Sequence, residues 1–115
     1  MIAFNKQLSE VCNEKNNRLC IGLDIDNRKL EINTISYMDG FIKELIEATI
    51  DICPVYKINL AFYERLGKAG YEILGKIPEY INNRSITIAD AKRGDIGNSS
   101  KYYAEAIFKT LNYDA

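Results

Sequence analysis

The stretch Ser85–Ser100, SITIADAKRGDIGNSS, decides the expected fold, because a short apolar run passes directly into charged residues and glycines. The run Ser85–Ala89 is rich in Ile and too short for a helix, which is typical of a strand buried on both faces. Asp90 and Lys92 follow it two residues apart, so on an extended chain their side chains point to the same side. We therefore expect both side chains to act on one ligand at the end of this strand.

Two similar apolar runs lie upstream, at Leu19–Leu23 and Val55–Leu60. Both are short and rich in Ile, Val and Leu, so they are candidate parallel strands as well. Between them, apolar residues recur every three or four positions, as on one stripe of an amphipathic helix. The stripe consists of Met38, Phe41, Ile42, Leu45, Ile46 and Ile50. This segment is expected to pack on the sheet.

Weaker patterns predict three further helices. The segment after the second strand has a helical period, but its glycines indicate a break and Pro78 is expected to end it. Its periodic residues are Phe62, Leu66, Ala69, Ile73 and Leu74, and its glycines are Gly67, Gly70 and Gly75. An opening helix is expected over roughly residues 2–15. The last helix is expected to be capped by Asn98, Ser99 or Ser100. Its expected face consists of Tyr103, Ala106, Ile107 and Leu111.

The expected element order is a helix followed by three strand and helix pairs, with strand starts 36 and 30 residues apart. This repeat is typical of parallel βα units in an α/β fold, which form either an open doubly wound sheet or part of a (β/α)₈ barrel. A whole barrel needs ~250 residues, so three units do not close one. Because no linker or low-complexity segment divides residues 1–115, we expect a single domain.

Composition excludes some function classes. The 15 Lys and Arg nearly balance the 16 Asp and Glu, and a net charge of -1 indicates no nucleic-acid partner. The polar N-terminus predicts neither a signal peptide nor a membrane span, so a cytoplasmic location is expected. Three cysteines without metal-ligand spacing, in a chain with no His, predict reduced thiols and no metal site.

Four polar residues fall at or near the carboxyl ends of the expected strands: Asp24, Lys57, Asp90 and Lys92. Any one of them alone is most simply a solvated surface charge. In parallel α/β folds, however, ligands bind at the carboxyl ends of the strands. We therefore expect the four side chains to converge on one rim of the sheet.

Three strings, one at each expected strand, carry a family resemblance: LCIGLDID at 19–26, CPVYKINLAFYERLG at 53–67 and IADAKRGDIGNSSKYYAEAIF at 88–108. In this order and spacing the chain resembles the orotidine 5'-phosphate decarboxylases, in the branch that carries the DAKRGDIGN signature. The resemblance implies a (β/α)₈ TIM barrel, of which residues 1–115 would supply an N-terminal helix and the first three βα units. It also implies a carboxy-lyase that converts orotidine monophosphate to uridine monophosphate and CO₂ in de novo pyrimidine biosynthesis.

The resemblance also implies roles for individual residues. Asp90, Lys92 and Asp95 match the Asp-x-Lys-x-x-Asp motif of the family, and Lys57 matches the lysine that joins their charge network. Lys92 would stabilise the carbanion that is left when CO₂ departs and would donate a proton to it, with no cofactor and no metal. Asp24 matches a residue that binds the ribose hydroxyls.

A homodimer follows from the same resemblance. The last aspartate of the family motif reaches across a dimer interface, so Asp95, with Ile96 and Ser99, would serve the site of the neighbouring subunit. Phosphate in (β/α)₈ enzymes is frequently held by the loops after strands seven and eight, which three βα units do not include. We therefore expect a truncated barrel that is inactive alone.

Two alternatives remain open from the sequence. One is a magnesium-dependent sugar-phosphate decarboxylase, which shares the Asp-x-Lys-x-x-Asp spacing but not the continuation Arg93–Asn98. The other is a non-catalytic half-barrel that binds a nucleotide or assembles with another chain.

Overall fold

The structure, a computed structural model, describes residues 3–115 and contains a sheet of three parallel strands. These are β1 (Cys20–Gly22), β2 (Val55–Asn59) and β3 (Ile86–Asp90), in the order β1-β2-β3. Gly22 pairs with Lys57, and Asn59 pairs with Asp90. Each strand lies at or within one residue of the run that predicted it, so all three expected strands are confirmed.

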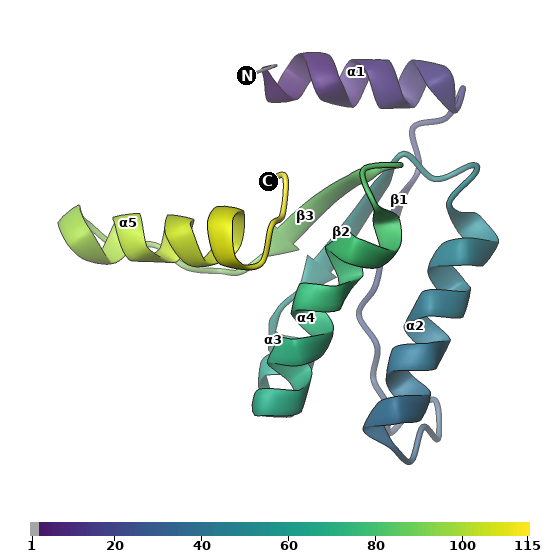
Figure 1. Cartoon of the computed structure of the whole chain (residues 1–115), viewed down its shortest axis with the longest axis vertical. Helices are drawn as coiled ribbons and strands as arrows, with labels where there is room; N and C mark the ends of the chain where they lie inside the picture. The colour runs from purple at the N-terminus through teal and green to yellow at the C-terminus, as the bar shows by residue number, and fades with distance from the viewer. Residues whose placement is uncertain (1–2) are drawn as a thin grey trace.

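Helices alternate with the strands as expected. They are α1 (Phe4–Glu14), α2 (Ile35–Thr49), α3 (Ala61–Glu64), α4 (Lys68–Ile81), α5 (Gly97–Glu105) and the π-helical turn η1 (Ala106–Thr110). The α/β order of a helix followed by three strand and helix units is therefore confirmed (Figure 1). The expected start of the first helix at residue 2 lies outside the described residues.

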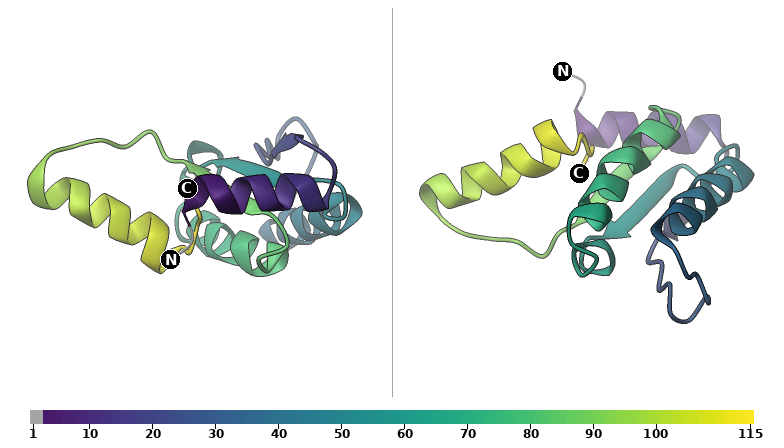
Figure 2. Two further views of the ribbon diagram at one scale, coloured as in Figure 1. Left: turned by 90° about the horizontal axis from the view of Figure 1, so that it is seen from above. Right: turned by 60° about the horizontal axis from the view of Figure 1, so that its bottom comes forward.

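The core lies between one face of the sheet and the helices α2 and α4, which run side by side (Figure 2). Its most buried side chains, each at most 1% exposed, include Met38, Ile42, Ile46, Tyr56, Ile58, Ile73, Leu74 and Ile77. The apolar stripe expected on α2 is thus confirmed, with Phe41 and Leu45 half-buried at its margin. Thr34 caps this helix, since its side chain accepts the Tyr37 N–H at 3.1 Å.

Within residues 3–115 the opposite face of the sheet is open apart from α1, which crosses the amino ends of the strands (Figure 1). A groove of about 510 Å³ lies between α1 and this face, with Phe4, Cys12, Val55 and Ile88 among its lining residues. Because side chains alternate along a strand, Lys57 and Asp90 point to the same open face at the carboxyl ends. The groove and the charged residues thus lie at opposite ends of the strands.

The segment after β2 breaks where the glycines predicted it, but Pro78 does not end the helix. Gly67, with φ of 63°, separates α3 from α4, whereas Pro78 lies inside α4. A proline lacks the N–H that would bond to the carbonyl four residues earlier, here that of Leu74. The hydroxyl of Tyr113 donates to this carbonyl at 2.9 Å, so the helix continues to Ile81.

The expected cap of the last helix is wrong, and its expected apolar face is only partly buried. The helix α5 begins at Gly97, directly after the extended residue Ile96, and no side chain caps it; Asn98, Ser99 and Ser100 lie in its first turn. No residue of α5 is buried, because the helix projects from the sheet (Figure 1). On the expected face only Ile107 is buried and Leu111 half-buried, whereas Tyr103 and Ala106 are exposed.

After η1 the chain returns to the free edge of β3. Ala115 accepts the Ala89 N–H at 2.7 Å and donates to the Thr87 carbonyl at 3.1 Å, the pattern of a parallel pair. The Asp114 carboxylate accepts the Thr87 N–H and hydroxyl at 2.8 and 2.9 Å. These contacts cover the edge of β3 from Thr87 to Ala89.

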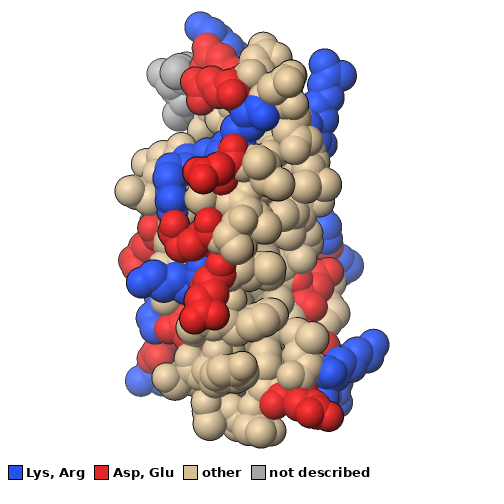
Figure 3. All heavy atoms as spheres, turned by 90° about the vertical axis from the view of Figure 1, so that its right-hand side faces the viewer, with Lys and Arg blue, Asp and Glu red and all other residues tan. Residues whose placement is uncertain are grey.

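The surface is of mixed charge. On the α2 side of the molecule acidic and basic side chains are interspersed, and neither sign forms a continuous patch (Figure 3). Within residues 3–115 no helix is long and apolar enough to cross a membrane.

Candidate active site

A chain of alternating charges lies along the carboxyl ends of the strands. The ammonium group of Lys57 lies 4.0 Å from Oδ2 of Asp24 and 3.7 Å from Oδ2 of Asp90. The same Asp90 oxygen forms an ion pair with Lys92. The structure therefore brings together Asp24, Lys57, Asp90 and Lys92, the four residues that the strand pattern placed on one rim.

Sheet register explains how these four residues meet. Lys57 is opposite Gly22 on β1, and a Cβ at Gly22 would lie 4.0 Å from Oδ2 of Asp24. A methyl group there would only touch the carboxylate, so the strand register, and not the missing side chain, places Asp24 beside Lys57. The other Asp24 oxygen accepts the N–H of Asn59 at 3.2 Å, which fixes the carboxylate against β2.

Lysines on two sides keep Asp90 ionised. The hydrogen bond from Lys92, followed by the positive charges of Lys92 and Lys57, holds the pKa of Asp90 below its usual value and outweighs partial burial. The side chain of Asp90 is 27% exposed and that of Lys92 is 63% exposed. Lys92 therefore carries its charge into open space next to a carboxylate, where a ligand can reach it.

The other three predicted site residues lie apart from this rim. The carboxylate of Asp95 accepts the N–H of Ile96 at 2.7 Å, and the ion pairs found within residues 3–115 do not include Asp95. Ile96 is 86% exposed, and Ser99 is exposed in the first turn of α5. The structure places all three on the projecting segment that follows Lys92.

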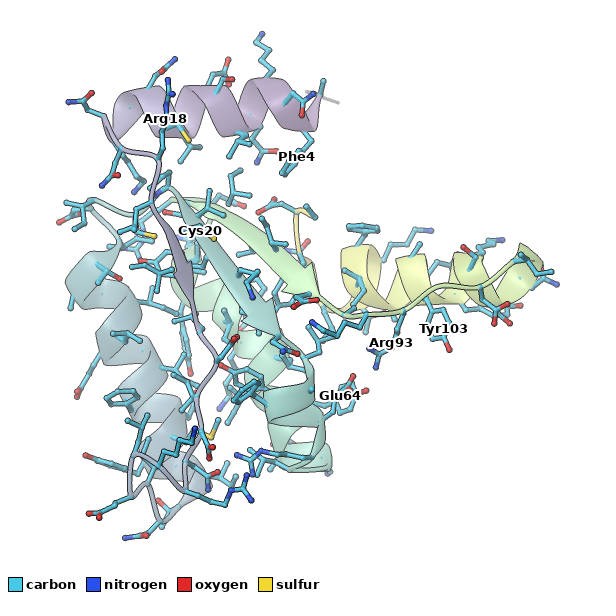
Figure 4. The ribbon with its side chains drawn as sticks, turned by 180° about the vertical axis from the view of Figure 1, so that it is seen from behind. Phe4, Arg18, Cys20, Glu64, Arg93 and Tyr103 are labelled. Atoms are coloured by element: carbon cyan, nitrogen blue, oxygen red, sulfur yellow. The ribbon has the colours of Figure 1, made fainter. Side chains whose placement is uncertain are left out.

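Sequence reasoning missed a second cluster, centred on Arg93 (Figure 4). Its guanidinium group pairs with Glu64 of α3 and donates to the Ala91 carbonyl at 2.7 Å. The ring of Tyr103 lies 5.8 Å from its Cζ atom, within cation–π range. Arg93 is visible within the DAKRGDIGN string, but its partner Glu64 is 29 residues away and no local pattern connects the two.

Tyr63 was missed for the same reason. Its hydroxyl donates to the Leu23 carbonyl at 2.5 Å, directly before Asp24, and burial raises the pKa of Tyr63. The side chain is completely buried, so this hydrogen bond fixes the backbone that carries Asp24.

The cysteines form no disulfide and no metal cluster. Cys53 is buried, Cys12 half-buried and Cys20 exposed. Across residues 3–115, no three His, Cys, Asp or Glu side chains are grouped so that they could hold a metal ion. The rim itself has two ammonium groups that alternate with two carboxylates, and these can attract a negative charge, donate a proton and bind hydroxyl groups.

Residues 17–115 match the family model described as orotidine 5'-phosphate decarboxylase / HUMPS family. The chain belongs to this family. The orotidine 5'-phosphate decarboxylase of Dehalococcoides mccartyi is 50% identical to it over 111 residues, which cover 96% of this chain and 40% of that protein. That of Christiangramia forsetii is 43% identical over 117 residues, covering 43% of its length. The chain thus spans about two fifths of the length of these curated relatives.

Solved structures agree with the family. The Leishmania donovani OMP decarboxylase superimposes with a TM-score of 0.82 at 32% identity, over 97% of this chain and 42% of that one. The fold is therefore α/β and corresponds to part of the decarboxylase TIM barrel, as the sequence predicted.

Proposed function

We propose that this chain contributes the charged half of an orotidine 5'-phosphate decarboxylase site, where orotidine monophosphate becomes uridine monophosphate and CO₂. The observation that carries the proposal is the alternating row Asp24, Lys57, Asp90 and Lys92 at the carboxyl ends of the strands. Family membership and 50% identity to a decarboxylase over nearly the whole chain support it. In this role the chain acts in cytoplasmic pyrimidine biosynthesis.

Lys92 is the proposed catalytic cation. When the bond between C6 and the carboxylate breaks, its electron pair stays on C6, and the pyrimidine ring does not readily delocalise that charge. A fixed ammonium group beside C6 lowers the energy of this carbanion. Lys92 then transfers one proton to C6 and regains one from solvent. Asp90 pairs with the ammonium group and holds it in place until the transfer.

The remaining residues of the row bind the substrate. The Asp24 carboxylate accepts hydrogen bonds from the ribose hydroxyls, and Lys57, held between two carboxylates, completes the network. No cofactor takes part in this scheme.

Asp95, Ile96 and Ser99 are proposed to complete the site of a second subunit. Their positions support this role, because all three are exposed on the segment that projects from the sheet. A homodimer would place this segment over the rim of the partner.

Absorbance-monitored decarboxylation of orotidine monophosphate by a full-length barrel that contains residues 1–115, with and without magnesium, tests the proposal. Turnover without magnesium that disappears in Lys92→Ala but persists in Lys109→Ala would support it; Lys109 is exposed on η1, far along the chain from the row. Equal turnover by Lys92→Ala would contradict the role of Lys92. A strict magnesium requirement would favour the sugar-phosphate alternative. Binding of uridine monophosphate without turnover would favour the non-catalytic half-barrel.

A further inference from the structure

The backbone of Lys92 adopts an unusual conformation. Its φ is 52°, in the left-handed region that residues other than Gly, Asn and Asp rarely adopt. Of the six non-glycine residues with positive φ within residues 3–115, four are asparagines. This conformation costs free energy and persists only where surrounding contacts impose it.

We propose that Arg93 and Glu64 form a positioning pair, which holds Lys92 in this left-handed conformation and so directs its ammonium group at Asp90. The functional meaning of this pair rests on the catalytic role proposed for Lys92. The effect of the pair on the backbone of Lys92 does not depend on that role, because it concerns only contacts within the chain.

The contacts of Arg93 close the loop around Lys92. Its guanidinium group donates to the Ala91 carbonyl at 2.7 Å. This hydrogen bond links the two residues that flank Lys92. The same group pairs with Glu64, and the Tyr103 ring lies at 5.8 Å (Figure 4). Arg93 therefore connects its own loop to both α3 and α5.

Contacts of the neighbouring residues fix the position of Glu64. It ends the short helix α3, in which the neighbouring Tyr63 is completely buried and bonded to the Leu23 carbonyl. The hydroxyl of Tyr71 in α4 donates to the Glu64 carboxylate at 3.1 Å. The side chains of Arg93 and Glu64 are only 27% and 28% exposed, so solvent competes for the pair less than at most other ion pairs of the chain.

The loop has few other contacts. All residues from Lys92 to Ala104 are exposed. Without the guanidinium contacts, the bond between Lys92 and Asp90 would itself have to maintain the left-handed backbone.

The test compares Glu64→Gln and Arg93→Lys with a matched control, Glu47→Gln. The control breaks another Arg and Glu pair, between Glu47 of α2 and Arg84, which is remote from the loop. Two properties are measured by NMR on the 115-residue chain: the titration of the Asp90 carboxyl carbon and the hydrogen exchange of the Gly94 and Asp95 amides. Neither measurement requires turnover.

In both Arg93–Glu64 variants the pKa of Asp90 should rise towards its ordinary value, and amide exchange at Gly94 and Asp95 should accelerate about fivefold. Glu47→Gln should change neither. An unchanged pKa of Asp90 in folded Glu64→Gln would overturn the proposal. In that case the pair would stabilise the loop without positioning Lys92 against Asp90. Inactivity of a full-length barrel that contains residues 1–115 towards orotidine monophosphate would count against the proposed function and leave this result intact.

Discussion

At the scale of single residues, Tyr113 supplies the hydrogen-bond donor that Pro78 lacks. The phenol is 3% exposed, and its hydroxyl donates to the Leu74 carbonyl in the middle of α4. A buried carbonyl without a partner costs roughly 1–3 kcal/mol. The proline in α4 is thus tolerated because of Tyr113, a residue that lies well outside this helix in the sequence.

This pairing predicts a non-additive pair of substitutions. Tyr113→Phe should lower the free energy of unfolding by about 1–3 kcal/mol, because it leaves the Leu74 carbonyl unpaired. In a Pro78→Ala background the loss should be at least about 0.5 kcal/mol smaller, since the new N–H of residue 78 takes over as donor. Urea denaturation of the four proteins measures the coupling. Strict additivity would show that the hydroxyl does not compensate for the proline.

At the scale of elements, two glycines of α4 have opposite surroundings. An ideal Cβ at Gly70 would lie 1.8 Å from the backbone oxygen of Tyr63, whereas one at Gly75 would meet nothing within 4 Å. The glycine at position 70 lets α3 and α4 approach each other closely. At position 75 glycine only weakens the helix.

The same substitution should therefore have opposite effects at these positions. Gly75→Ala should raise the free energy of unfolding by about 0.5–1 kcal/mol, because alanine is the better helix former. Gly70→Ala should lower it by more than about 2 kcal/mol, since only a backbone shift relieves the clash. Thermal unfolding of the wild type and both variants measures the two changes, and each variant serves as the control for the other. Equal shifts in the two variants would show that the approach of α3 to α4 is not as close as described.

Contacts between α2 and α4 also predict a dependence on pH. Burial would raise the pKa of Asp39, but Lys76 and Tyr80 each donate to its carboxylate at 2.6 Å and hold the pKa below its usual value. A carboxyl group with a lowered folded pKa stabilises the fold above its unfolded pKa of about 3.9. That contribution is lost as the pH falls through the folded value.

Asp39→Asn should therefore be less stable than wild type near neutral pH, by about 1 kcal/mol, and the difference should shrink as the pH falls below about 4. Urea denaturation between neutral and acidic pH measures it. Glu44→Gln, on an exposed part of the same helix, is the control and should show a smaller difference. A difference for Asp39→Asn that does not change with pH would rule out this ionisation as its source.

At the scale of the whole molecule, the chain is flat and has a projecting arm. Its extents are 40 × 39 × 19 Å, and its radius of gyration of 14.5 Å exceeds the roughly 13 Å expected for a compact chain of this length. The helix α5 accounts for the projection, and among the described residues only α1 covers the face of the sheet opposite α2 and α4 (Figure 2). Ile96, Tyr102 and Phe108 are large exposed apolar residues on or next to this arm.

The proposed dimer predicts that this arm controls the mass in solution. Ile96→Glu should shift the chain from dimer to monomer, because it places a charge where an apolar side chain would be buried against the second copy. Leu30→Glu, at an exposed apolar position in the loop after β1, should leave the mass unchanged. Light scattering over a range of concentrations measures both. A monomeric wild-type chain at high concentration would contradict the dimer for this chain.

The amino-acid sequence by itself determined the order and positions of the elements. The spacing of apolar residues and the length of apolar runs involve only residues that are close in the sequence. The three strands and the buried stripe of α2 could therefore be predicted from the sequence pattern. The four residues of the charged rim could also be predicted, because parallel strands bring their carboxyl ends to one edge. The family was recognisable from the strings that surround those residues.

Only the tertiary structure decided which distant side chains meet. Glu64 and Arg93 are 29 residues apart, and Leu74 and Tyr113 are 39 apart, so no local period connects either pair. The direction of α5 could not be predicted either, since no residue of α5 is buried and the contacts that hold the arm come from Ile107 of η1 and the return of the chain to β3. Contacts of this kind depend on how helices pack on the sheet, and that packing is a property of the folded chain as a whole.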